Sequence, residues 1–444
     1  MSKVNEFTAY RGHVISPRDF NSYDDFVDGC LLVDHDGKIV DVGDWTEVLA
    51  KHGKAAKVHE YGKRVIMPGF IDLHIHLVQI AQTGRSGDTL LGWLNKYIFP
   101  AEVKFARMEH ATKLADWFFR ELARNGTTLS SVFTSIHKNA ADIAFTNAAE
   151  RGCRVIMGKT LMDRNAPDNL SEDSERSLEE SEELCAKWHN YDNGRLLYAF
   201  TPRFAPTSTK RQLEGAAELF HKYPGSYMQT HLSENSDEIA WVKELFPGCK
   251  NYLDVYASHG LIGKNSLFAH SIHLSDSEID RLVESGSAAI HCPSSNLFLK
   301  SGVFPYLRAK TKGLKIGLGS DVAAGPEMSL FKVMKDAAYV QSELWLAPRE
   351  LLYLATLSGA KAVNLDDQVG SLEKGKEADF IVVDPTLKSS VPRDILEQDA
   401  DEILSSMVYV GDDRMVVETY VRGRAIYKAE ESNERKRDAL NVGS

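Results

Sequence analysis

Short apolar runs alternate with longer amphipathic stretches through the central part of the chain, from Arg64 to Asp321. The runs are rich in β-branched and aromatic residues, and each is followed by a polar turn and a helical pattern. The strand-like runs occupy residues 69–76, 127–133, 154–162, 195–204, 226–234, 266–273, 288–296 and 315–321. Helix-like stretches lie between them, for example at residues 109–125, 140–151, 210–223 and 276–285.

Apolar strands that alternate with amphipathic helices indicate a parallel sheet that is buried on both faces. Eight such units in about 250 residues fit a closed barrel better than an open doubly wound sheet. We therefore predict an α/β fold whose main part, residues 69–367, is a (β/α)₈ TIM-type barrel.

The two ends of the chain follow the period of β-strands instead. Residues 29–40 alternate around a hairpin signal at Asp36-Gly37, and residues 378–385 and 416–427 are similar in style. Neither end has enough strands for a stable core. We therefore expect residues 1–68 and 368–428 to combine into one small β-sandwich domain, followed by a polar tail at 429–444.

Composition and charge narrow the possible partners. The 444 residues include 52 Lys+Arg and 63 Asp+Glu, which gives a net charge of −11 and argues against nucleic acid. The sequence has no long apolar stretch for a membrane span and no apolar N-terminal segment for secretion. Its five cysteines are dispersed without a Cys-x-x-Cys pair, which predicts reduced thiols and a cytoplasmic protein. The acidic stretch 171–183 is predicted to be a solvated helix face.

Several chemically active residues fall where the predicted strands end, which is the face of a barrel that carries active sites. His74 and His76 end the first run, and their spacing of two lets both imidazoles reach one metal ion. His231 and Glu234 end the fifth run. Glu234 would lie where the strand breaks into its loop, either as a general acid/base or as the cap of a helix at 235–245; both interpretations stay open.

His270 ends the sixth run and Asp321 ends the eighth. Asp321 could bind the metal and accept a proton from a water molecule that the metal activates. His270 could bind the metal or polarise the attacking water. Each residue alone is weak evidence, but their arrival on one face of one barrel predicts a metal-dependent hydrolytic site.

The fourth run ends in Arg203 and contains no lysine that could be carboxylated to bridge two metals. The fork of the guanidinium suits a carbonyl or carboxylate acceptor, although a surface ion pair is an equal alternative. His291-Cys292 lacks the Pro-Cys-x-x-Cys that zinc deaminases of the cytidine type require. No phosphate-binding loop or dinucleotide fingerprint occurs either.

These residues lie in stretches that resemble the amidohydrolase superfamily and, more narrowly, its guanine deaminase family. The similarity spans residues 10 to 428, and the stretches that carry it are 67–79, 93–102, 162–168, 201–204, 231–235, 291–296 and 319–322. Leu73, Gly92 and Ser320 depart from the family pattern, as does Pro326-Glu327, but no metal ligand is missing.

The resemblance implies one divalent metal, expected to be zinc with iron as the alternative. Its ligands would be His74, His76, His231 and Asp321, with His270 as a neighbour or a fifth ligand. The catalytic residues would be Glu234, Asp321 and His270. The purine would be bound by Gln79, Trp93, Arg203 and Phe204, beside Glu234 and His270.

The activity that the resemblance implies is hydrolytic deamination of guanine to xanthine and ammonia. The resemblance also implies a small-molecule purine as the substrate and a homodimer as the assembly. Two alternatives remain at this point. One is a deaminase of a related amino-heterocycle, such as 8-oxoguanine, a pterin or an aminotriazine. The other is a non-catalytic scaffold with the same fold.

Overall fold

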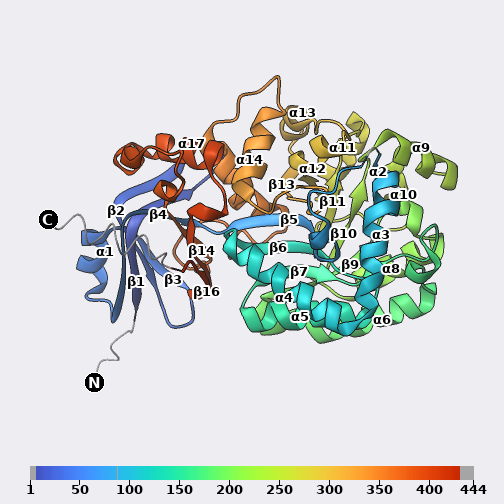
Figure 1. Cartoon of the computed structure of the whole chain (residues 1–444), viewed down its shortest axis with the longest axis horizontal. Helices are drawn as coiled ribbons and strands as arrows, with labels where there is room; N and C mark the ends of the chain where they lie inside the picture. Colours follow the sequence, from blue (N-terminus) through green and yellow to red (C-terminus); the bar gives the residue numbers. More distant parts are fainter. Residues whose placement is uncertain (1–6, 88, 431–444) are drawn as a thin grey trace.

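The computed structural model describes residues 7–87 and 89–430, with a barrel beside a smaller sheet (Figure 1). Residues 1–6 lie outside the described residues. The prediction that the N-terminal segment is not a secretory signal falls partly on them. The part of the predicted polar tail beyond residue 430 also lies outside the described residues.

Eight parallel strands form a nearly closed barrel, which confirms the predicted fold class. In order around the sheet they are β5 (Phe70–His76), β6 (Thr127–Phe133), β7 (Arg154–Gly158), β9 (Leu196–Pro202), β10 (Tyr227–Leu232), β11 (Ser266–His270), β12 (Ala288–His291) and β13 (Lys315–Leu318). The short β8 (Thr160–Leu161) pairs with β9, so the predicted run 154–162 is two strands rather than one.

The last strand returns beside the first. Just beyond β13, the amide of Asp321 donates to the carbonyl of His74 at 2.8 Å, and the amide of His76 donates to the carbonyl of Val322 at 3.1 Å. The backbone thus joins the two ends of the barrel segment at the level of the predicted metal ligands.

Helices cover the outside of the barrel and its ends (Figure 1). The longer ones are α4 (Met108–Arg124), α5 (Lys138–Arg151), α6 (Ser174–Trp188), α8 (Lys210–Lys222), α9 (Ser236–Leu245), α11 (Asp276–Ser285), α14 (Leu330–Tyr339) and α15 (Pro348–Ala355). Shorter ones are α2 (Leu90–Trp93), α3 (Phe99–Glu102), α7 (Tyr191–Gly194), α10 (Tyr252–Ser258), α12 (Pro293–Phe298), α13 (Tyr306–Thr311) and α16 (Leu357–Ala362).

Local sequence signals set where these helices begin and end. In α11 the Ser275 side chain accepts from the amide of Glu278, and the Glu278 carboxylate accepts from the amide of Ser275. This reciprocal capping box fixes the first turn. Gly286 ends the same helix with φ of 73°, a left-handed conformation that glycine adopts without strain. The predicted helix at 276–285 is therefore correct at both ends.

The barrel interior is a packed core. Ile71, Leu129, Ile156 and Leu267 point inward from four strands, and residues of α16 and the segment after it, including Val363, belong to the same cluster. The Tyr227 hydroxyl donates to the carbonyl of Val363 at 2.7 Å and anchors this segment. The filled interior leaves the strand ends as the place for a binding site.

The two ends of the chain form a second sheet together, as predicted. Its strands are β1 (Thr8–Pro17), β2 (Tyr23–Val33), β3 (Ile39–Asp44), β4 (Lys57–Pro68), β14 (Phe380–Val383), β15 (Val416–Val421) and β16 (Arg424–Lys428), with α1 (Trp45–His52) and α17 (Ala400–Val410) beside them. The expected sandwich takes the form of one mixed sheet in the order β16-β15-β14-β4-β1-β2-β3. Its centre is the pairing of β14 with β4, one strand from each end of the chain.

A buried ion pair network joins the sheet to the barrel. Arg154 on β7 is fully buried and donates to the carboxylates of Glu377 and Asp379, which lie at the entry to β14. Arg422 donates to the same Glu377 carboxylate at 2.6 Å. The two domains are therefore held at this point by charges that have been removed from water.

Three predictions from composition and charge can be compared with the structure. Within the described residues, no helix combines the length and apolar character needed to cross a membrane. The five cysteines are free thiols; four are buried and Cys249 is half-buried. The acidic stretch falls largely on α6, but Glu172 and Glu180 face the buried amine of Lys159 instead of solvent.

We predict that Arg154→Met destabilises the protein strongly, because it leaves the buried Asp379 carboxylate without its cation and removes one of the cations around Glu377. Removal of one partner of a buried pair costs about 3–5 kcal/mol. Urea denaturation monitored by circular dichroism would measure the loss. As a control, Arg124→Met removes a half-exposed pair with Asp413 and should shift the midpoint little. Equal midpoints for the two variants would contradict the structural role of Arg154.

Candidate functional site

An irregularity in the first barrel strand brings His74 and His76 to the site. The pairing of β5 with β6 shifts register between Asp72 and Ile75. Leu73 before the shift belongs to the inner core, whereas Ile75 after it belongs to the outer core between barrel and helices. The shift therefore lets His74 and His76 both point inward above a layer of apolar side chains, as their spacing predicts.

Strand β10 supplies His231 with a fixed ring orientation. Its Nδ1 lies 2.7 Å from the backbone carbonyl of Arg203, which can only accept a hydrogen bond. Nδ1 is therefore the protonated nitrogen, and Nε2 keeps a free lone pair that points to the site. A carbonyl behind a histidine is the usual support of a metal-binding imidazole.

Glu234 lies just after the break of β10, where Ser233 has a φ of 49°. The helix that follows is capped by Asn235, whose side chain accepts from the amide of Asp237, together with the carboxylate of Glu238. Glu234 itself is buried and lines the pocket. Of the two interpretations left open by the sequence, the cap belongs to Asn235, and Glu234 is free for chemistry.

His270 and Asp321 end their strands in left-handed backbone conformations, with φ of 65° and 51°. Such values are uncommon outside glycine and cluster at functional sites, where surrounding contacts hold them. The Nδ1 of His270 lies 2.9 Å from Oδ1 of Asn296, which accepts from it. The Nε2 of His270 consequently faces Glu234 Oε2 at 3.5 Å and Asp321 Oδ2 at 3.8 Å.

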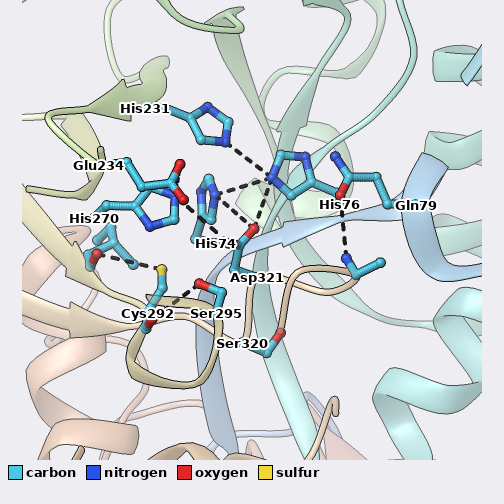
Figure 2. A network of polar contacts seen from close by, with 12 residues as sticks. His74, His76, Gln79, His231, Glu234, His270, Cys292, Ser295, Ser320 and Asp321 are labelled. Carbon is cyan, nitrogen blue, oxygen red and sulfur yellow. Dashed lines mark hydrogen bonds and ion pairs between the residues drawn. The ribbon is translucent and has the colours of Figure 1, made fainter. Parts of the chain in front are cut away.

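The four predicted ligands and His270 gather in two overlapping groups, His74–His76–His231 and His74–His270–Asp321, as Figure 2 shows. The Nε2 of His76 lies 3.2 Å from that of His74 and 3.3 Å from that of His231. Asp321 Oδ1 lies 3.4 Å from Nε2 of His74 and 3.2 Å from Nε2 of His76. Three lone pairs and a carboxylate oxygen thus face one another inside the barrel mouth.

Burial keeps these imidazoles neutral. It lowers the pKa of His76 to about 3 and lowers the pKa of His74 and of His231 as well. Burial alone would raise the pKa of Asp321, but its contacts with the two neighbouring histidines hold it well below its usual range. Three neutral imidazoles and one carboxylate are a donor set that suits a divalent ion such as zinc. The residues present therefore fit a single metal.

Glu234 is set up for proton transfer beside this cluster. Burial raises the pKa of Glu234 to about 7, close to the value at which a group both donates and accepts readily. The Ser301 hydroxyl donates to its Oε1 at 3.1 Å from a separate loop. The pKa of His270 is pulled down by burial, but Glu234 and Asp321 outweigh this and raise it.

The remaining predicted residues form the wall of the same pocket. Gln79, Trp93, Arg203 and Phe204 all line it together with His76, His231 and Glu234. The hollow that they line holds about 410 Å³ of space between atoms, part of which is open to solvent. The structure thus brings the predicted site residues other than His74 to the lining of one cavity at the carboxyl ends of the strands. His74 contacts two of these lining residues, His76 and Asp321.

Arg203 is the cation of this wall and is only 4% exposed. Its Nη1 donates to Oε1 of Glu102 at 2.6 Å, and its guanidinium carbon lies 5.8 Å from the centre of the Phe99 ring. The surface ion pair that the sequence left open is therefore wrong. Arg203 has an acidic partner, but both groups are buried in the pocket wall.

Sequence reasoning did not assign roles to several residues of the site. Glu102 and Asn296 lay inside stretches that carried the family resemblance, but nothing in their spacing marked them. Asp72 also lay inside such a stretch, whereas Glu238 and Ser301 lay outside all of them, and nothing in the spacing of the three marked them. Asp72 accepts from the amide and hydroxyl of Ser320, at 3.0 and 2.5 Å, and ties β5 to the loop that carries Asp321.

His291 and Cys292 stay outside the metal cluster. The ring of His291 stacks on Phe304 with centroids 4.9 Å apart, and burial lowers its pKa to about 3. The Cys292 thiol lies within 3.6 Å of the carbonyl of Ile290, in the inner core. Both side chains therefore belong to the packed interior and not to the metal cluster.

The comparisons with known proteins agree with this geometry. The model of the amidohydrolase family matches residues 65–426. A guanine deaminase of Escherichia coli (strain K12) is 42% identical over 441 residues, which cover 96% of this chain and 99% of that protein. The solved structure of an E. coli guanine deaminase superposes with a TM-score of 0.90, at 41% identity over 95% of this chain and all of that one. A guanine deaminase from C. acetobutylicum with bound guanine in the active site superposes with a TM-score of 0.88, at 33% identity and the same coverage.

We predict that His76→Ala removes the metal, because it deletes the imidazole that lies closest to the other three ligands. Elemental analysis of the purified protein should fall from about one divalent ion per chain to a small fraction of that. His291→Phe is the matched control, since it changes a buried histidine outside the cluster and should keep the full metal content. Full metal content in the His76 variant would show that the ligand set is wrong.

Proposed function

The chain belongs to the amidohydrolase family, and on that basis we propose that it hydrolyses guanine to xanthine and ammonia. The observation that carries the proposal is that two groups of residues face each other across one pocket. A cluster of three imidazoles and a carboxylate lies on one side, and a wall with buried Arg203 and Gln79 lies on the other. The full-length similarity to guanine deaminases supports the same substrate.

We propose that His74, His76, His231 and Asp321 hold the metal, with zinc as the ion and iron as the alternative that the same donors accept. When bound, a divalent ion at this position lowers the pKa of a water molecule and so supplies the nucleophile near neutral pH. The Arg203 carbonyl behind His231 and the Asp72–Ser320 contact behind Asp321 keep two of the ligands in place.

Glu234 is the residue that moves protons. As water adds to purine C2, Glu234 accepts one of its protons and delivers it to a ring nitrogen. The second proton of the same oxygen passes through Asp321 or Glu234 to the amino group, so that the C–N bond breaks, ammonia leaves and the oxygen becomes the C2 carbonyl. The pKa of Glu234, about 7, suits both steps. His270, held by Asn296, stabilises the negative charge that develops on the attacking oxygen. Asp321 is the second carboxylate that can accept a proton from the water.

The wall of the pocket orients the purine. Arg203 can donate to the carbonyl oxygen at C6, and Gln79 offers both a donor and an acceptor to the ring edge. Phe204 and Trp93 enclose the ring faces with apolar surface. These contacts place C2, which carries the amino group, toward Glu234 and the metal ligands.

We propose further properties of the assembly, the location and the domains together with this activity. We expect the enzyme to act as a cytoplasmic homodimer in purine breakdown, without nucleic acid or membrane partners. We further propose that the barrel domain spans residues 69–367 and that the β domain consists of residues 1–68 and 368–428.

Glu234→Gln should abolish turnover while the metal stays bound, because the amide keeps the shape of the side chain but cannot carry the proton. The expected loss in kcat is about 10²–10⁴-fold. Ammonia release from guanine measures activity, and elemental analysis of the same sample confirms the metal. A fully active variant would overturn the role of Glu234.

The substrate is tested by kcat/KM across guanine, 8-oxoguanine, pterin and an aminotriazine. We expect guanine to be the best of the four, because Arg203 and Gln79 are placed for a purine edge. A higher value for another heterocycle would replace guanine as the substrate and keep the hydrolytic chemistry. A metal-loaded protein inactive on all four would instead favour the non-catalytic scaffold.

A further inference from the structure

The short helix α3 carries a carboxylate that sequence reasoning did not use. Glu102 is the last residue of α3 and is only 2% exposed, although it belongs to a segment between β5 and α4 that runs over the barrel mouth. Its Oε1 accepts from Nη1 of Arg203 at 2.6 Å. Burial raises the pKa of Glu102, and the charge of Arg203 together with hydrogen bonds from Arg203 and Gln79 offsets part of this rise.

Two features of α3 fix the guanidinium together. Glu102 holds one of its nitrogens, and the ring of Phe99, three residues earlier, lies 5.8 Å from its central carbon. Because the guanidinium is planar, its hydrogen bond to Glu102 and its contact with the Phe99 ring together restrict the orientation of the Arg203 side chain. The remaining donors of Arg203 are then set in advance for a ligand in the pocket.

The pair also decides the charge of the wall. Among the described residues that line the pocket, Arg203 is the only lysine or arginine. A buried guanidinium without a counter-ion binds anions strongly, because nothing else replaces the hydration that its charge has lost on burial. With Glu102 beside it, this corner of the pocket carries no net charge and can still donate hydrogen bonds.

We propose that Glu102 is a positioning residue that sets specificity: it fixes Arg203 for a neutral carbonyl acceptor and makes the pocket reject anions of the same shape. This inference rests on the proposed activity toward guanine. Guanine is neutral at pH 7, whereas xanthine loses a proton much more readily. Charge cancellation at Arg203 therefore weakens the hold on the ionised product and favours its release.

The test compares two ligands that are not turned over. Hypoxanthine is a neutral purine with the carbonyl at C6 and no amino group, and xanthine becomes an anion as pH rises above neutrality. Isothermal titration calorimetry of metal-loaded protein at pH 6 and pH 8.5 gives the Kd of each. We expect wild-type protein to bind xanthine more weakly at the higher pH.

Glu102→Gln keeps an acceptor for Arg203 but removes the charge. We expect xanthine to bind more tightly at pH 8.5 than at pH 6, and hypoxanthine to bind about tenfold more weakly at both. In turnover, KM for guanine should rise more than kcat falls. A ratio of xanthine to hypoxanthine affinity equal to that of wild type would overturn the inference.

Glu102→Asp provides a second variant that keeps the charge and shortens the reach. Hypoxanthine should bind more weakly, but the preference against the xanthine anion should persist; wild-type affinity for both ligands would contradict the positioning role. Glu172→Gln is the matched control, because Glu172 is also the carboxylate partner of a buried cation, Lys159, but does not line the pocket. Its affinity ratio should stay that of wild type.

Failure of the proposed activity is a separate result. Wild-type protein that releases no ammonia from guanine would refute that activity while the binding comparison could still be made. A wild-type protein that deaminates guanine, with a Glu102→Gln variant whose ligand preference is unchanged, would refute the inference alone.

Discussion

The seam between β5 and β13 is the contact on which the site depends. His74 and His76 come from the start of the barrel, and Asp321 comes from its far end. Hydrogen bonds from the Asp321 amide to His74 and from the His76 amide to Val322 bring these residues together, and buried Asp72 holds Ser320 beside them. A barrel that failed to close would leave each ligand on a separate edge, with no common point for a metal.

Arg203 links the two halves of the pocket. Its backbone carbonyl orients the ring of His231, and its side chain, gripped by Glu102 and Phe99, faces the ligand. A displacement at the end of β9 would therefore disturb both the histidine cluster and the pocket wall that we propose for the purine. Glu234, the proposed general acid/base, is supported differently, by Ser301 from one loop and by the capped start of α9.

The residues at strand ends could be predicted, because a parallel barrel places all of its carboxyl ends on one face and the apolar runs mark where each strand stops. The register shift in β5 could not, since Leu73, His74 and Ile75 look the same in either register. Glu102 was missed for another reason: it lies in a segment of short helical turns without a clear period, and only the fold brings it to Arg203. The role of Glu234 needed the structure to show that Asn235 is the cap.

The pairing of β4 with β14 has a consequence for how the chain is made. Pro68 lies opposite Phe380, so the central strand pair of the smaller sheet joins segments from the two ends of the polypeptide. During synthesis the N-terminal strands leave the ribosome long before their partner exists, and β4 presents an open edge in the meantime. The barrel between them can close fully only after Val363 has emerged, because α16 and Val363 fill its interior. Its closure brings the two halves of the sheet near each other. The smaller sheet is therefore completed late, after the closed barrel has brought its two halves together.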